Sequence, residues 1–358
     1  MTLSVAQDYR AAMRFSVKRL WPVCVLLGVS ATLSGAAPEG QYKVLKAVKT
    51  GGAGGYDYVY ADPAAGLLYV PRLGSKGRVT IFDINTLQQA GEIPQTSAHG
   101  VAISSRSHHG FATSKPVAMW DSRTLRMIKS IPVNGSPDGI LYDPFTDRVY
   151  VFSHRAPNTT VINAADGSIA GTIDLGGAPE QAVTDGQGHI YVDIEDRDSI
   201  AVVGAETMTV SGHFDLGGQG GTCAGLAMDV QHQILFAACR SPHTMVMLSA
   251  KDGTIITSLP IGEGTDGAAF NANTMEAFSS QGDGTLTVIK ENSPTSFAVE
   301  QTLQTLPGAR TLTLDSRANI LYLLAAEFGQ PPTTPRPGGY PGRGPMLPDS
   351  FTILAVGR

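Results

Sequence analysis

The apolar residues of this chain fall in short stretches separated by turns rich in Gly, Pro, Asp and Asn, and this pattern recurs about every 42 residues. Two copies are clear in Ser136–Asp143 (SPDGILYD) and Ala178–Asp185 (APEQAVTD). Each segment ends in an Asp or an equivalent residue. The residue five positions before that end, which we call the anchor, marks the register of each copy. Seven such anchor residues follow at spacings of 39 to 44 residues: Asp57, His99, Asp138, Glu180, Ala224, Asp266 and Arg310.

Each copy of the repeat predicts four short strands. The anchor leads into the first strand; examples of the next three are Leu67–Val70, Val79–Phe82 and Ile169–Ile173. Four strands at this period are typical of a β-propeller blade. The seven anchors therefore predict an all-β, seven-bladed β-propeller of four-stranded blades. The Gly and Pro in every copy exclude a helical solenoid, and an open β-solenoid remains an alternative.

The two ends of the repeat region predict how the propeller closes. The seventh copy stops after its third strand, Phe351–Leu354, whereas Tyr42–Val48 precedes the first anchor and alternates like an outer strand. We expect residues 42–48 to complete the last blade, because this pairing removes an exposed sheet edge. The Pro- and Gly-rich residues 330–348 interrupt the same blade. They predict an extended loop on the mouth face, either a lid or docking arm or an inert insertion.

The first 36 residues predict a secretory signal peptide. Positively charged residues precede the apolar run Leu20–Leu33, and small residues ending at Ala36 follow it. Cleavage after Ala36 would leave residues 37–358 as one propeller domain, periplasmic or secreted and without a transmembrane span. Met13 is an alternative start. An uncleaved anchor is the alternative fate, although the apolar run is shorter than the ~18 residues that a spanning helix needs.

Net charge narrows the range of partners. Removal of residues 1–36 takes away four of the 26 Lys and Arg residues and one of the 31 Asp and Glu residues, which leaves a net charge of about −8. This balance argues against nucleic acid, whose binding depends on neutralising phosphates. We expect a monomer that binds a small molecule, a peptide or a protein of the cell envelope.

Two cysteines remain outside the first 36 residues. Cys223 precedes the first strand of the fifth copy and Cys239 ends the second, and their midpoint lies in the turn 229–233. The two residues should therefore face each other across an antiparallel pair, with Cα atoms about 4.5–5.5 Å apart, which is within disulfide reach. We predict a disulfide, as suits an exported protein. Two buried free thiols are the alternative.

The second strands of three copies contain a shared Tyr-Val pair, in Tyr69–Arg72, Tyr150–Ser153 and Tyr191–Ile194. Longer distinctive segments are Ser279–Val288, Gly308–Asp315, Ala326–Gly329 and Ser350–Arg358. Through these segments the chain resembles the YVTN β-propeller repeat proteins, and within them the YncE-like exported bacterial proteins. The resemblance covers residues 42–358 and implies an exported propeller. The single Trp120-Asp121 pair is WD40-like but has no companions in the other copies.

In a propeller, residues before the innermost strands and after the second strands line one mouth of the central channel. The anchors would bring charged side chains together there, with Ala224 as the neutral member, and second-strand ends would add His154 and Glu195. We expect a ligand-binding mouth. Alternatively, these residues only satisfy turn backbone groups and the arginines only pair with rim carboxylates. The candidate ligand-binding residues are Asp57, His99, Asp138, Glu180, Arg240, Asp266, Arg310 and Glu327.

Four mouth residues also suit a divalent metal. His99, His154, Asp138 and Glu180 offer nitrogen and oxygen ligands for Ca²⁺, Mn²⁺ or Zn²⁺. We expect no cofactor and no catalytic residue, with a bound divalent metal as the alternative. The predicted function is a non-enzymatic binding protein or interaction scaffold. A metal-dependent lactonase-like hydrolase on the same face is the alternative, whereas a quinoprotein dehydrogenase fits poorly because Trp120 is the one tryptophan outside residues 1–36.

Overall fold

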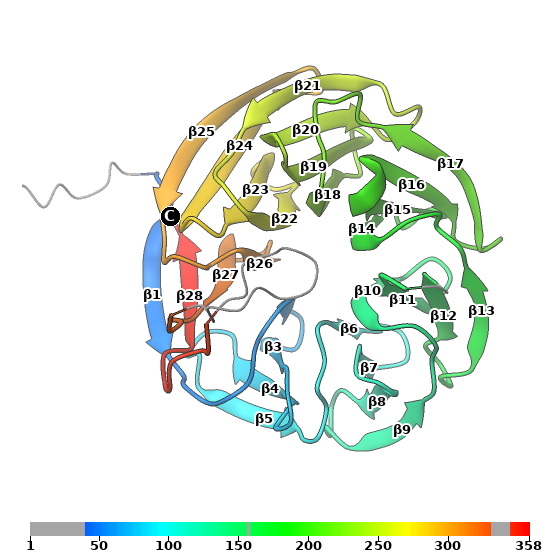
Figure 1. Cartoon of the computed structure of the whole chain (residues 1–358), viewed down its shortest axis with the longest axis vertical. Coiled ribbons are helices and arrows are strands. Elements are labelled where there is room, and N and C mark those ends of the chain that lie inside the picture. The colour runs from blue at the N-terminus through cyan, green and yellow to red at the C-terminus, as the bar shows by residue number, and fades with distance from the viewer. Residues whose placement is uncertain (1–39, 156–157, 331–343) are drawn as a thin grey trace, which may run out of the picture. The chain divides into compact units, whose positions relative to one another are not determined.

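The computed structural model describes residues 40–155, 158–330 and 344–358, which form seven antiparallel sheets of four strands each (Figure 1). The expected signal peptide lies outside the described residues, as do residues 331–343 of the Pro- and Gly-rich segment. Contacts divide the chain into residues 1–37 and 38–358, and the second unit is the one described below. Its seven sheets are arranged as blades around a common centre, which confirms the predicted seven-bladed β-propeller.

The blades are numbered in chain order, from the innermost strand outward. Blade 1 comprises β2 (Tyr60–Asp62), β3 (Leu67–Arg72), β4 (Arg78–Asp83) and β5 (Gln89–Ile93); blade 2 comprises β6 (Val101–Ile103), β7 (His109–Ala112), β8 (Val117–Asp121) and β9 (Met127–Ile131). Blade 3 comprises β10 (Pro137–Asp143), β11 (Arg148–Ser153), β12 (Thr159–Asn163) and β13 (Ile169–Ile173). Blade 4 comprises β14 (Pro179–Thr184), β15 (His189–Ile194), β16 (Ser199–Gly204) and β17 (Thr209–Asp215), with the short 3-10 helix η1 (Glu195–Arg197) after β15.

The remaining three blades follow the same order. Blade 5 comprises β18 (Cys223–Asp229), β19 (Ile234–Arg240), β20 (His243–Ser249) and β21 (Ile255–Pro260); blade 6 comprises β22 (Thr265–Asn271), β23 (Glu276–Gln281), β24 (Thr285–Ser293) and β25 (Ser296–Gln304). Blade 7 comprises β26 (Thr311–Asp315), β27 (Ile320–Ala325), β28 (Thr352–Gly357) and β1 (Lys43–Lys49).

Blade 7 joins segments from both ends of the described chain. Strand β1 pairs antiparallel with β28, from Lys43 opposite Gly357 to Lys49 opposite Thr352. The predicted closure by residues 42–48 is therefore confirmed. Because β1 occupies the outer position of the sheet, blade 7 has the same four strands as the other six blades.

The core consists of apolar layers between neighbouring blades. Inner strands such as β18 and β23 are buried along their whole length, whereas the outer strand β13 is partly exposed. An inner strand is covered on both faces, which explains the almost continuously apolar sequence of a strand such as β19. In the layer between blades 1 and 2, the fully buried Trp120 packs against Tyr69 with ring centroids 6.4 Å apart. These layers hold the ends of the inner strands at defined positions around the channel.

A repeated hydrogen bond joins several neighbouring blades. The tyrosine at the third position of the second strand donates its hydroxyl to a backbone carbonyl of the following blade. The pairs are Tyr150 to Ala205 (2.8 Å), Tyr191 to Ala250 (3.0 Å) and Tyr322 to Ile84 (3.0 Å). In blade 5 this position is Phe236, so the seam between blades 5 and 6 cannot form the bond.

Candidate functional site: a charged ring at the channel mouth

Charged side chains from all seven blades form a closed ring around one mouth of the channel, which we call the mouth ring. Six are anchor residues at or just before the innermost strands, and three lie at the ends of second strands. Each side chain is within ion-pair or hydrogen-bond reach of the next. In order, they are Asp57, His99, Asp138, His154, Glu180, Glu195, Arg240, Asp266 and Arg310.

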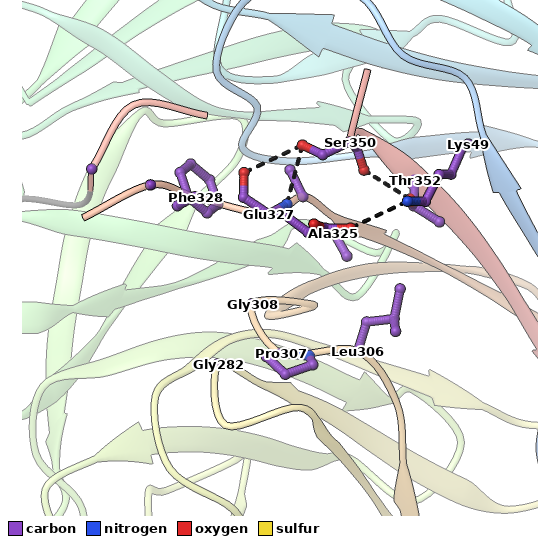
Figure 2. Close-up of a pocket in the computed structure, with 13 residues that line it drawn as sticks. Lys49, Gly282, Leu306, Pro307, Gly308, Ala325, Glu327, Phe328, Ser350 and Thr352 are labelled. Atoms are coloured by element: carbon purple, nitrogen blue, oxygen red, sulfur yellow. Dashed lines mark hydrogen bonds and ion pairs between the residues drawn. The ribbon is translucent and has the colours of Figure 1, made fainter. Parts of the chain in front are cut away.

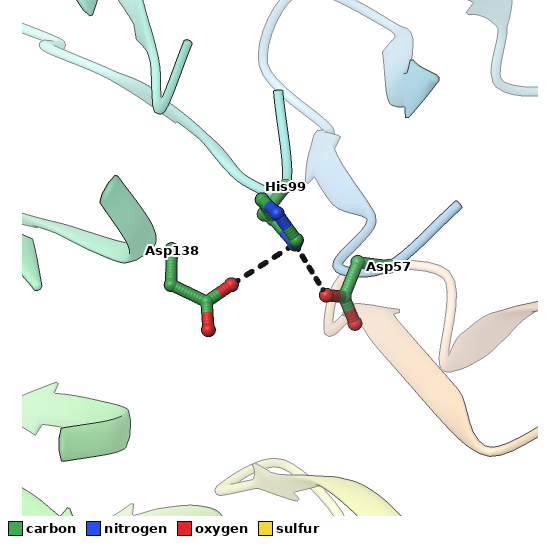
Figure 3. Close-up of side chains that lie close together, drawn as sticks. All are labelled: Asp57, His99 and Asp138. Carbon is green, nitrogen blue, oxygen red and sulfur yellow. Dashed lines mark hydrogen bonds and ion pairs between the residues drawn. The ribbon is translucent and has the colours of Figure 1, made fainter. Parts of the chain in front are cut away.

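One arc of the mouth ring alternates carboxylates with imidazoles. His99 Nδ1 lies 2.8 Å from Asp57 Oδ2 and 3.0 Å from Asp138 Oδ1 (Figure 3). His154 Nε2 lies 3.4 Å from both Asp138 Oδ2 and Glu180 Oε1. Asp138 therefore stands between the two histidines and contacts both. This arc contains the four residues that the sequence suggested as metal ligands.

Asp138 has a carboxylate oxygen without a hydrogen-bond donor. His99 Nδ1 carries at most one hydrogen, and its hydrogen bond goes to Asp57. Asp138 Oδ1 is consequently buried without a hydrogen-bond partner. Burial, together with the nearby carboxylates of Asp57 and Glu180, raises the pKa of Asp138 to about 6. A cation at this position would stabilise the ionised carboxylate.

The opposite arc is built on two arginines. Arg240 donates from Nη1 to Glu195 Oε1 at 2.9 Å and from Nη2 to Asp266. Arg310 Nε lies 2.9 Å from Asp266 Oδ2, and its Nη2 lies 4.0 Å from Asp57 Oδ1. Asp266 is thus held between two guanidinium groups, and Arg310 of blade 7 connects it to Asp57 of blade 1.

Glu180 and Glu195 link the two arcs within blade 4. Their carboxyl groups lie within hydrogen-bond reach of each other. Burial and this hydrogen bond raise the pKa of Glu195. Burial alone would raise the pKa of Glu180 as well, but its hydrogen bonds with His154 and Glu195 outweigh that effect and lower it. The hydrogen bond that His154 donates to Glu180 raises the pKa of His154 to about 9.

Below the mouth ring the innermost strands enclose a cavity of about 180 Å³. The Tyr58 hydroxyl donates to Glu180 Oε2 at 3.0 Å, and burial raises its pKa. The Gln181 side chain accepts the N–H groups of Leu226 and Ala268, both at 3.1 Å, and so bridges blades 4, 5 and 6. Sequence reasoning missed Tyr58 and Gln181. The available signal was their position next to the anchors Asp57 and Glu180.

Asp193 is a buried acid close behind the ring. It lies in β15, is fully buried, and neither carboxylate oxygen has a hydrogen-bond partner. Burial, with the negative charge of Glu180 as a second cause, raises the pKa of Asp193 well above its usual range.

Glu327 is the one candidate ligand-binding residue that does not join the mouth ring. It forms an exposed ion pair with Lys49 at 3.2 Å, and its side chain is 63% exposed. Strand β27 ends at Ala325, two residues earlier, and the chain then runs into the Pro- and Gly-rich insertion instead of a tight turn. Glu327 therefore does not occupy the position that residues after the second strand have in the other blades. Ala224, the neutral anchor, is buried in β18.

A groove of about 490 Å³ lies beside blade 7 and is separate from the mouth ring. Leu306, Pro307 and Phe328 contribute to its walls, and the Lys49–Glu327 pair lies at its edge (Figure 2). None of the nine mouth-ring residues lines this groove. Its only ionisable lining groups among the described residues are Lys49 and Glu327, which pair with each other.

Cys223 and Cys239 face each other across β18 and β19 and are joined by a disulfide, with Cα atoms 3.7 Å apart. This separation is shorter than the one expected for facing residues of a regular antiparallel pair. The register shifts between Cys223 and Gly225, so the pair lies at a β-bulge. Bulges locally disrupt the ladder and bend the strand.

No protein-family model matches the chain, and no curated protein matches it in sequence. Solved structures share its fold. The crystal structure of RRP9 WD40 repeats aligns with a TM-score of 0.68 and 12% identity, covering 89% of this chain and 98% of that chain. The structure of U3-55K aligns with a TM-score of 0.67 and 12% identity, covering 87% and 98%. At this identity the similarity shows the fold alone, a seven-bladed propeller like that of WD40 repeats.

Within the described ranges, no helix has the length and apolar character that crossing a bilayer requires.

Proposed function

We propose that this propeller is a binding protein whose mouth ring takes a small organic cation. The observation that carries the proposal is the donorless Asp138 Oδ1, buried between His99 and His154. A buried carboxylate oxygen without a partner is costly, and an ammonium group of a ligand would supply the missing hydrogen bond and charge. The proposal rests on Asp138 and not on the net charge of the mouth ring, because His154, with its pKa raised to about 9, adds a positive charge to those of the two guanidinium groups. The propeller fold is suited to binding or scaffolding.

The test is ligand binding by three proteins: the wild type, Asp138→Asn and the control Glu206→Gln. Glu206 is an exposed acid in the turn between β16 and β17, the two outer strands of blade 4, and is not a mouth-ring residue. Thermal shift would screen polyamines, amino acid amides and quaternary amines, and calorimetry would follow each hit. We expect at least one of these compounds to bind the wild type and Glu206→Gln with similar affinity. Asp138→Asn should bind the same compound at least tenfold more weakly. Equal binding to all three proteins, or no hit at all, would contradict the proposal.

A second candidate function is a metal-dependent, lactonase-like hydrolase on the same face. The observation that favours it is the arc of two overlapping triads that share Asp138, each with donor atoms within 4.8 Å of one another. Imidazole nitrogen and carboxylate oxygen suit Zn²⁺ or Mn²⁺. Metal analysis and a lactone hydrolysis assay decide between the two functions. Activity that depends on added metal and is lost in His154→Ala would favour the hydrolase, and an inactive protein would reject it.

We also propose that the protein is exported and related to the YVTN-repeat, YncE-like propellers. This proposal is supported by the basic start, apolar run and small residues of positions 1–36, and by the segments named in the sequence analysis. Expression of the full chain in a bacterial host, followed by mass spectrometry of the periplasmic and secreted fractions, tests it. We expect a mature chain that begins at Ala37. A chain that retains residues 1–36 in the cytosol would contradict export.

A further inference from the structure

A second cluster of ionisable side chains lies on the face opposite the mouth ring. Asp229 ends β18, His232 follows in the turn to β19, and Glu291 comes from β24 of the next blade. Asp229 pairs with Ile234 at one end of the β18–β19 ladder, whereas Cys223 pairs with Cys239 at the mouth end. The cluster therefore bridges the seam between blades 5 and 6, one strand length away from the mouth.

The geometry places one histidine nitrogen between two buried carboxylates. His232 Nδ1 lies 2.7 Å from Asp229 Oδ2 and 2.7 Å from Glu291 Oε1. Asp229 is 1% exposed and Glu291 is 2% exposed. A single hydrogen on Nδ1 cannot serve both acids. Asp229 Oδ2 and Glu291 Oε2 are both buried without a hydrogen-bond partner.

The other blades show that this cluster departs from the repeat. In six blades a residue in the last part of the third strand, or just after it, donates its N–H to a carbonyl of the inner turn, and in blade 6 that residue is Glu291 of β24. The corresponding residues of the other five blades carry no charge, and the His232 position is a threonine in blade 3. They are Ile84, Ser122, Ala164, Ala205 and Ala250, with Thr146 in the inner turn of blade 3.

The tyrosine hydrogen bond of other seams is absent here, because the position is Phe236, as it is Phe111 in blade 2 and Phe278 in blade 6. What distinguishes this seam is the pair of buried acids that meet one histidine. Two buried carboxylates that face one imidazole need more positive charge than one hydrogen supplies. The departure from the repeat therefore points to a cation and not to packing.

We propose that Asp229 Oδ2, His232 Nδ1 and the Glu291 carboxylate bind a divalent transition metal, Zn²⁺ or Mn²⁺, which connects blade 5 to blade 6. One nitrogen and two carboxylate donors suit these ions better than Ca²⁺, which prefers oxygen ligands throughout. A tetrahedral Zn²⁺ site with bonds of about 2.1 Å holds its donors about 3.4 Å apart. The donors therefore have to separate slightly from 2.7 Å. His232 is 27% exposed at its side chain, which leaves access for the ion and for a water ligand.

The experiment uses tag-free protein that has been stripped with chelator and then dialysed against Zn²⁺ or Mn²⁺. Bound metal is counted by elemental analysis, and the melting temperature is recorded with and without the metal. The variants are Glu291→Ala and His232→Thr, which introduce residues that this chain itself uses at the equivalent positions of other blades and so should fold. His154→Ala is the matched control, because it removes a histidine between two carboxylates at the mouth instead of at the seam.

We expect each seam variant to bind one metal equivalent fewer than the wild type, and His154→Ala to retain the seam equivalent. Metal should raise the melting temperature of the wild type and His154→Ala by a few degrees, and this shift should disappear in Glu291→Ala and His232→Thr. Equal metal content in the wild type and both seam variants would overturn the proposal, as would a wild type that binds neither metal. Failure of the organic-cation proposal would leave this result unaffected, since the two sites share no residue.

Discussion

The guanidinium carbon of Arg358 lies 4.6 Å from the centroid of the Tyr42 ring, so a residue before the first blade contacts a residue after the last strand. Both side chains also reach Glu276, at the start of β23 in blade 6. The Tyr42 hydroxyl donates to Glu276 Oε2 at 2.6 Å, and the Arg358 guanidinium donates to Glu276 Oε1. Both chain segments that form the outer part of blade 7, the one at Tyr42 and the one at Arg358, are thus bonded to blade 6.

Tyr42→Phe should destabilise the protein by about 1–2 kcal/mol. The substitution keeps the buried ring but removes the hydroxyl that bonds Glu276 and Asn319, and a hydrogen bond to a charged group contributes roughly that amount. Urea unfolding followed by intrinsic fluorescence measures the change in the free energy of unfolding. Lys43→Ala, at an exposed position of β1, should change it by less than about 0.5 kcal/mol. A loss in Lys43→Ala as large as that in Tyr42→Phe would show that the hydroxyl is not the cause.

Acid should weaken the same attachment. Burial by itself would raise the pKa of Glu276, but its hydrogen bonds with Glu300, Tyr42 and Thr274, together with the charge of Arg358, lower it overall. A carboxyl whose pKa is lower in the folded state stabilises the fold above its unfolded pKa, and this contribution is lost as the pH falls through the folded pKa. The wild type should therefore be more stable than Glu276→Gln at pH 7, and the difference should shrink below pH ~4.5. Unfolding curves at pH 7, 5 and 3.5 check this, and a constant difference would contradict it.

The arginine arc of the mouth should show strong coupling between Arg240 and Asp266. Asp266 is buried, and burial raises its pKa while both guanidinium groups oppose that effect. Removing Arg240 leaves this acid with Arg310 alone, so Arg240→Ala should cost about 2 kcal/mol, a value reduced from that of a fully buried pair because the guanidinium is partly exposed. In a double-mutant cycle, Arg240→Ala with Asp266→Ala should cost less than the sum of the single changes. Simple additivity would mean that the contact contributes nothing measurable.

The disulfide should contribute about 3 kcal/mol of stability. It closes a loop with a sequence separation of 16 residues, for which the chain-entropy treatment gives roughly that value. The variant with both Cys223→Ala and Cys239→Ala should melt at a lower temperature than the wild type. A reductant should lower the melting temperature of the wild type and leave the double variant unchanged. A reductant effect on the double variant would indicate a cause other than this bond.

The blade count and the closing strand could be predicted from the sequence because both depend on a local pattern. The anchors recur at nearly constant spacing, and Tyr42–Val48 alternates as an outer strand does. The mouth residues could be named for a related reason, since equivalent positions such as Asp57 and Asp138 project toward the same axis in every blade. Glu327 was placed wrongly because the insertion after β27 breaks that equivalence.

Contacts between blades were beyond the reach of the sequence pattern. The hydrogen bond from Tyr58 to Glu180 joins residues 122 positions apart, and that from His232 to Glu291 joins residues 59 positions apart. No local spacing indicates either contact. A comparison of the copies would have signalled the contact of His232 with Glu291, because Glu291 occupies a position that is Ala, Ile or Ser in five other blades.

The closed mouth ring depends on the whole circle of blades. Arg310 of blade 7 reaches Asp57 of blade 1, and blade 7 is complete only when β1 has paired with β28. A chain that lacked any one blade would have an open row of charges with unneutralised acids at its ends. If the proposed binding at the mouth holds, a molecule in which blade 7 has not closed would bind the ligand more weakly than the complete propeller.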